Sequence, residues 1–166
     1  MSSSDRRKAL LGLASFAGLA ACGFEPAYAP AGGQAGDLQG RILVDAPNSA
    51  LEFALVERLE QRLGRASDAK YRLSYNVSTA SERLALTTDE ETTRYSVRGW
   101  INFQLRDTAT GNVVQSGGLN NFTAYSATAS TIATLTAERD AERRLMVILA
   151  DQLVTRLTAT ADTWLR

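Results

Sequence analysis

Leucines recur at every fourth position in the first clear apolar pattern of the chain. They are Leu51, Leu55, Leu59 and Leu63. This spacing keeps them on one face of a helix. Ser49 and Glu52 have the order of a capping box at the start of that helix, and Gly64 is suited to end it. We therefore expect an amphipathic helix over residues 49–64, preceded by a short apolar strand over residues 41–44.

Alternation of apolar and polar residues predicts strands further along the chain. One covers residues 71–78, and its alternation breaks near Thr79 and Ala80, where we expect a β-bulge or a bend. The clearest strand covers residues 94–105. Its apolar side is formed by Tyr95, Val97, Gly99, Ile101, Phe103 and Leu105. Trp100 falls on the opposite, polar side of the same strand.

A loop, a turn and a second helix complete the pattern. The polar residues 87–93 predict a loop between the two strands. Residues 107–112 have the Asp, Gly and Asn content of a turn, so residues 113–125 should return as an antiparallel hairpin partner. Over residues 137–160 the apolar positions again recur with the period of a helix. They include Ala141, Leu145, Leu149, Leu153 and Leu157.

These elements predict an α+β fold in the order strand, helix, strand, strand, strand, helix. Each amphipathic helix needs an apolar surface to cover, so we expect a mixed four-stranded sheet with both helices packed on one face. The expected core joins both helices to the central strand. Its members are Leu55, Leu59, Val97, Ile101, Phe103, Leu145 and Leu149.

The N-terminal segment has the organisation of an export signal. Three basic residues precede an uncharged run over residues 9–21, which is shorter than the roughly 20 residues that span a bilayer. The run ends in Leu-Ala-Ala-Cys, which resembles a bacterial lipobox. We interpret residues 1–21 as a lipoprotein signal peptide and Cys22 as the lipidated first residue of the mature chain. An ordinary secretory signal with an incidental cysteine is the alternative, and Arg6-Arg7 leaves open Sec or twin-arginine export.

Residues 22–40 are rich in Gly, Ala and Pro, and they include Pro26 and Pro30. Such a segment cannot form a long helix and has little apolar surface to bury. We expect it to be a flexible tether between the lipid and one α+β domain, residues 41–166. That domain is long enough for a single core.

Composition excludes several classes of function. The 18 Lys and Arg residues balance 18 Asp and Glu residues, so no basic surface for nucleic acid is indicated. The absence of His removes the commonest general base and the usual zinc ligand, and a single Cys leaves no intrachain disulfide. The sequence contains no nucleophile elbow and no phosphate-binding loop. We expect a protein without catalytic residues, metal or cofactor.

Residues 108–137 contain no charged residue, although 22% of the chain is charged. One interpretation is a surface that an uncharged polar partner buries, because buried hydroxyls and amides can bond to the partner whereas unpaired buried charges are strongly unfavourable. The candidate contact residues are Asn120, Asn121, Phe122, Thr123 and Tyr125. The alternative is a hairpin strand and a flexible loop, with Phe122 and Tyr125 facing inward.

Three arginines lie near the predicted loop over residues 87–93. Arg83 and Arg94 flank it, and Arg98 shares a strand face with Arg94. Clustered guanidinium groups are suited to bind phosphate through bidentate hydrogen bonds. The alternative is that these arginines are solvated or pair with the acidic residues at 89–91.

The segment Cys22-Gly23-Phe24-Glu25-Pro26-Ala27-Tyr28, followed by a linker and the element order above, resembles the LPS-assembly lipoprotein family, LptE. The resemblance implies a lipoprotein anchored by its N-terminal lipid in the outer membrane and facing the periplasm. Its implied partners are an outer-membrane β-barrel, which it plugs and helps to assemble, and lipopolysaccharide, which it helps to insert into the outer leaflet. Family contacts with lipopolysaccharide match Arg83 and Arg94 loosely. A subunit of another periplasmic transport or envelope complex is the alternative.

Overall fold

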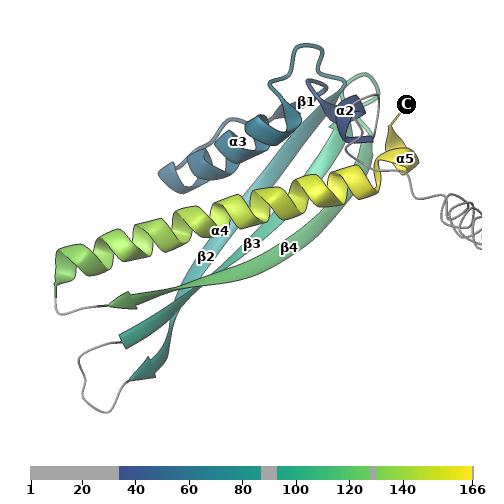
Figure 1. The fold of residues 1–166 in the computed structure, drawn as a ribbon. Helices are drawn as coiled ribbons and strands as arrows, with labels where there is room; N and C mark the ends of the chain where they lie inside the picture. Colours follow the sequence, from purple (N-terminus) through teal and green to yellow (C-terminus); the bar gives the residue numbers. More distant parts are fainter. Residues whose placement is uncertain (1–33, 87–92, 128–129, 166) are drawn as a thin grey trace, which may run out of the picture.

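A computed structural model describes residues 34–86, 93–127 and 130–165 of the chain (Figure 1). Cys22, the predicted signal peptide and most of the predicted tether lie outside these residues. The elements in chain order are α2 (Gln34–Leu38), β1 (Ile42–Val44), α3 (Ala50–Leu63), β2 (Tyr71–Leu86), β3 (Thr93–Asp107), β4 (Val113–Ala127), α4 (Thr131–Ala159) and α5 (Ala161–Trp164).

The four strands form one mixed sheet in the order β1-β2-β3-β4. The short strand β1 is parallel to β2, and the other neighbours are antiparallel. Both long helices, α3 and α4, lie on the same side of the sheet (Figure 1). The predicted α+β class and helix arrangement are confirmed, with the short helices α2 and α5 in addition.

The core lies between the two long helices and the sheet. All seven predicted core residues are at most 2% exposed and belong to one apolar cluster. Trp100 points to the other side of the sheet and is 39% exposed, as its position on the polar side predicted. α4 comes close to the sheet at Gly99, where an added Cβ would lie 2.9 Å from Leu145 Cδ2.

The predicted bulge near Thr79 and Ala80 is wrong. Both residues pair regularly with Gly99 and Arg98 of β3, and the register shifts only between Arg83 and Ala85. The side of β2 that faces the helices becomes steadily more exposed along the strand, from buried Leu73 to exposed residues near its far end. The apolar alternation therefore stops because the helices no longer cover that side, and the pairing itself continues.

Two boundaries also differ from the expectations. α4 begins at Thr131, six residues before the expected start, and the Ser130 side chain caps it by accepting the Ala133 N–H at 3.4 Å. The first turns are exposed, including Ile132 at 80%, so the sequence has no apolar stripe that would predict them as helix. The folded part also extends into the predicted tether, because α2 places Leu38 in the core, fully buried.

Candidate functional site

The helices cover one side of the sheet and leave the other side open. We call this second side the open face. It is formed by the even-numbered side chains of β2, β3 and β4, most of which are exposed. Arg72 at one end of this face pairs with Asp45 at 2.6 Å, and Arg98 on β3 pairs with Glu82 of β2 at 3.5 Å. These ion pairs are exposed and contribute little to stability.

The centre of the open face carries two large aromatic side chains. Phe122 is 61% exposed and Trp100 is 39% exposed. Trp100 lies opposite Asn120, and Phe122 lies opposite Arg98, so the two aromatic residues are diagonal neighbours on adjacent strands. Asn102 and Asn120 flank them on the same face. Exposed aromatic rings next to amides are typical of protein-binding surfaces, where rings supply contact area and amides supply hydrogen bonds.

The predicted partner-contact residues divide between the two sides of the sheet. Asn120 and Phe122 lie on the open face, as the prediction requires. Thr123 and Tyr125 instead lie beneath α4 and are only 9% and 8% exposed. The Thr123 hydroxyl donates to the Ala141 carbonyl at 3.0 Å. Both side chains are thus covered by α4 in the structure, and a partner contact through them stays an untested prediction.

Tyr125 and Asn121 have structural roles on the helix side. The Tyr125 ring stacks on Tyr95, with 5.2 Å between ring centroids. Burial raises the pKa of Tyr125, and the nearby carboxylate of Glu138 raises it further. Asn121 is half-buried, and its side-chain oxygen accepts the Phe122 N–H at 2.8 Å. Tyr125 therefore faces inward, which was the alternative interpretation.

The three predicted phosphate-binding arginines do not form one cluster. Arg83 pairs with Tyr95 in the sheet register and so lies on the helix side, where its guanidinium is 5.8 Å from the Tyr95 ring centroid. Arg94 and Arg98 lie on the open face. Arg98 faces Glu82, whereas Arg94 has no carboxylate partner in the described part of the chain. The acidic residues at 89–91, which are the alternative partners of these arginines, lie outside the described residues. Within the described part, Arg94 is the guanidinium of the three that is most available to a phosphate.

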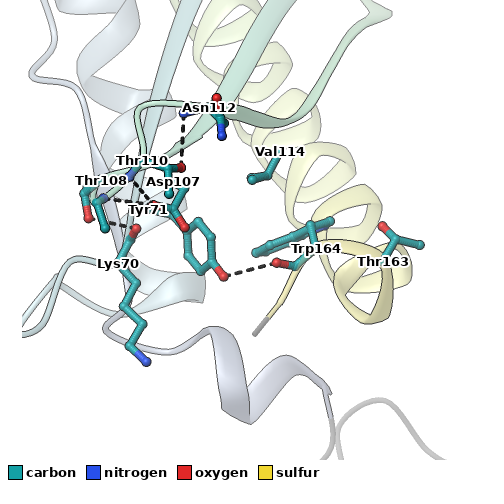
Figure 2. A pocket seen from close by; sticks show the side chains of 10 residues that line it. Lys70, Tyr71, Asp107, Thr108, Thr110, Asn112, Val114, Thr163 and Trp164 are labelled. Atoms are coloured by element: carbon teal, nitrogen blue, oxygen red, sulfur yellow. Dashed lines mark hydrogen bonds between the residues drawn. The ribbon is translucent and has the colours of Figure 1, made fainter.

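A pocket of about 560 Å³ opens at the other end of the sheet, between the β3–β4 turn and α5 (Figure 2). Tyr71 packs edge-on against Trp164 and donates its hydroxyl hydrogen to the Trp164 carbonyl at 3.2 Å. The Asp107 carboxylate accepts the N–H groups of Thr110 and Ala109 at 2.8 and 2.9 Å, which lowers its pKa. These polar groups are engaged in shaping the turn, and we assign no ligand to this pocket.

The described residues contain no group of three or more His, Cys, Asp or Glu side chains that is arranged to hold a metal ion. None of the described helices is long and apolar enough to cross a membrane. The open face is therefore the candidate functional site that the structure supports best. Sequence reasoning missed Trp100 and Asn102 as members of it, although their position on the polar side of β3 was a usable signal.

Comparison with known proteins gives one family and a set of similar folds. A model of the LptE family, described as lipopolysaccharide-assembly, matches residues 40–157. No curated protein matches the chain. Similar solved structures show the same fold at low sequence identity.

Several of these structures, including the following two, are described as lipoproteins. A candidate lipoprotein of Caulobacter crescentus is 21% identical, with a TM-score of 0.68 over 79% of this chain and 96% of that chain. The rare lipoprotein B of Shewanella oneidensis is 15% identical, with a TM-score of 0.56 over 74% of this chain and 95% of that chain.

Proposed function

This chain belongs to the LptE family of lipopolysaccharide-assembly proteins, and we propose that it acts as an outer-membrane lipoprotein that plugs a lipopolysaccharide-translocating β-barrel. In this proposal it helps to assemble the barrel and to insert lipopolysaccharide into the outer leaflet. The role requires binding surfaces and no catalytic group, which agrees with a family described as lipopolysaccharide-assembly.

The observation that carries the proposal is the open face. Its centre exposes Trp100 and Phe122 beside two asparagines, and β4 contributes no charge to it. Porin-type barrel lumens are polar, so they can exchange hydrogen bonds with amides and hydroxyls. A charge buried against such a wall without a partner would be strongly unfavourable. The part of the open face around Trp100, Asn120 and Phe122 is therefore suited to lie against the inside of a barrel.

The anchor in this proposal is Cys22, which lies outside the described residues. A single acyl chain holds a protein to a membrane only marginally, so we propose that Cys22 is diacylated through sulfur and acylated on nitrogen. Intact mass of the membrane-extracted protein tests this directly. A mass without lipid adducts would exclude the anchor.

Co-purification with a charged variant tests the plug. The chain is co-expressed with its barrel partner and purified in detergent through a tag on the chain. Wild type should recover a large outer-membrane barrel protein, and Asn120→Asp should recover far less because the complex would bury an unpaired carboxylate. Gln61→Glu makes the same amide-to-carboxylate change on an exposed position of α3 and should behave as wild type.

Unfolding of the free variants separates a loss of binding from a loss of folding. Asn120 is exposed, so its replacement by Asp should change the free energy of unfolding by less than about 0.5 kcal/mol. If the wild-type chain recovers no barrel, the plug proposal fails and a different envelope complex becomes the better assignment. If Asn120→Asp recovers as much barrel as Gln61→Glu, the open face is not the contact surface.

A further inference from the structure

β4 forms one of the two edges of the sheet, because it comes last in the strand order β1-β2-β3-β4. β4 pairs with β3 along one side, and in the described part of the chain no strand lies along the other (Figure 1). A strand edge offers a row of backbone N–H and C=O groups to any extended chain that can reach it. The direction of these groups in β4 follows from the hydrogen bonds at the opposite edge.

The backbone N–H and C=O groups of odd-numbered residues in β2 point toward β1. The Tyr71 N–H donates to the Arg41 carbonyl at 3.0 Å, and the Leu73 carbonyl accepts the Asp45 N–H at 3.0 Å. Even-numbered residues of β2 therefore point toward β3, where they pair with even-numbered residues. Odd-numbered residues of β3 then pair with odd-numbered residues of β4. The even-numbered residues of β4 are left with N–H and C=O groups that point outward.

Three contacts agree with this direction. The Gly118 carbonyl accepts from Arg156, and the Ala124 carbonyl accepts from Arg144, each at 3.4 Å. The Phe122 N–H donates to the Asn121 side chain at 2.8 Å. Both arginine contacts are long for a hydrogen bond, so an incoming strand would displace them at little cost.

The arginine beside Gly118 has space because of a second glycine. An added Cβ at Gly117 would lie 2.9 Å from Arg156 Nη2. The Arg156 guanidinium lies 5.8 Å from the Phe103 ring centroid. Asn120 lies between the two capped carbonyls, and its outward groups face no neighbouring strand among the described residues.

A groove follows this edge on the side of α4. It has a volume of about 670 Å³, and Asn120, Ile148 and Gln152 contribute to its walls. The Gln152 side-chain oxygen is buried and has no hydrogen-bond partner within the described residues. A buried acceptor without a donor is unfavourable, so this atom is suited to receive a donor from an incoming chain.

The sequence of β4 lacks the usual protection of an edge strand. Natural edges are commonly short, or they carry Lys or Pro that discourages pairing. β4 has 15 residues with neither charge nor proline. Its outward-pointing residues are also the ones whose side chains form the open face, so one partner can contact both.

We propose that the outer edge of β4, centred on Asn120, pairs with an extended segment of the barrel partner and gains it as a fifth strand. This rests on the plug function proposed above. A closed barrel wall has no free strand edge, so the segment must come from a loop or a chain end that enters the lumen. The segment should carry no basic residue where it crosses the Gly117–Gly118 pair, because the Arg156 guanidinium lies there and would repel it.

A proline variant tests the backbone contact. Asn120→Pro removes the outward N–H, and proline is tolerated on an edge strand where the N–H faces solvent. Asn120→Ala keeps the N–H and serves as the matched control. We expect Asn120→Pro to bind the barrel protein at least about fivefold more weakly than Asn120→Ala, which corresponds to one lost hydrogen bond. Both free variants should fold, as thermal unfolding will show.

Amide hydrogen exchange of the wild-type protein gives a second measurement. In the free chain the Asn120 N–H should exchange quickly, whereas the Leu119 and Asn121 N–H groups, which point toward β3, should exchange slowly. In the complex the Asn120 N–H should become at least about tenfold slower, as expected for an amide that gains a strand partner. This measurement holds even if Asn120→Pro does not fold.

The outcomes separate this proposal from the plug function. If wild type recovers the barrel but Asn120→Pro binds like Asn120→Ala and Asn120 exchange is unchanged, the edge proposal fails and the plug function stands. If wild type recovers no barrel, both fail. If Asn120→Pro instead abolishes a homodimer of the free chain, the occupant is a second copy and the proposal is overturned.

Discussion

Phe103 and Trp100 lie on the same strand and face opposite sides of the sheet. Phe103 is 2% exposed within the core, whereas Trp100 is 39% exposed on the open face. Phe103→Ala should lower the free energy of unfolding by roughly 3–5 kcal/mol, because it leaves a cavity in the core. Trp100→Ala should change it by less than about 1 kcal/mol and should weaken only binding to the barrel. Urea unfolding of the two free variants gives the comparison, and equal losses would contradict the facing of β3.

Tyr75 should make the free energy of unfolding depend on pH in the alkaline range. Its hydroxyl donates to the Asp45 carbonyl at 3.3 Å. Burial, helped by the charges of Glu52 and Asp45, raises the pKa of Tyr75 to about 12. An unfolded tyrosine titrates near pH 10, so the stabilisation is present below about pH 10 and is lost as the pH rises through about 12.

The expected result is a fall in the free energy of unfolding across that alkaline range. Tyr75→Phe should reduce the fall, because the unfolded state then has one fewer proton to lose. Urea unfolding at a series of alkaline pH values measures the slope for both proteins. An identical slope in Tyr75→Phe and wild type would show that other groups cause the pH dependence.

At the scale of elements, close packing of α4 on the sheet depends on Gly99. An added methyl group there would lie 2.9 Å from Leu145 and 3.1 Å from Leu149, both fully buried. Gly99→Ala should therefore destabilise the protein by about 1–3 kcal/mol through overpacking. Gly36→Ala is the matched control, since nothing lies within 4 Å of its added Cβ and alanine favours the helix α2. Thermal unfolding should separate them, and equal midpoints would mean that α4 can shift without loss.

The sequence predicts an element well where its capping residues and its buried apolar side chains mark the same segment. The Ser49 side chain accepts the Glu52 N–H at 3.2 Å, and Glu52 accepts the Asn48 N–H at 2.7 Å, so the predicted capping box forms with its second bond one residue earlier. The leucine row of α3 then faces the core. In contrast, the first turns of α4 are helical but exposed. Apolar periodicity arises only where one side of an element is buried, so it does not detect an exposed helical turn. The same limit explains the wrongly predicted bulge in β2, where the alternation ends with the burial and the strand pairing continues.

At the scale of the whole molecule, the candidate site depends on which side of the sheet each residue faces. Thr123 alternates with Phe122, and the uncharged stretch alone cannot tell the two sides apart. Only the pairing of Val97 with Thr123 and the position of α4 above them fix that difference. Arg83 is a second example, because its register with Tyr95 separates it from Arg94 although both arginines flank the same predicted loop. The sequence therefore identified residues of a suitable chemical type, but for β4 and for Arg83 it could not show which side of the sheet each side chain faces.

The opposite facing of these arginines allows a test of where lipopolysaccharide binds. If lipopolysaccharide phosphate is bound on the open face, Arg94→Glu should weaken binding by about tenfold, because a charge-assisted hydrogen bond is replaced by repulsion. Arg83→Glu makes the same charge change on the helix side and should bind as wild type, although it loses the contact with Tyr95. Both variants should still recover the barrel, because Arg94 lies at the start of β3, away from the centre of the open face at Trp100 and Asn120. Binding of fluorescent lipopolysaccharide at fixed ionic strength measures the difference, and an equal or larger loss in Arg83→Glu would place the phosphate contact away from the open face.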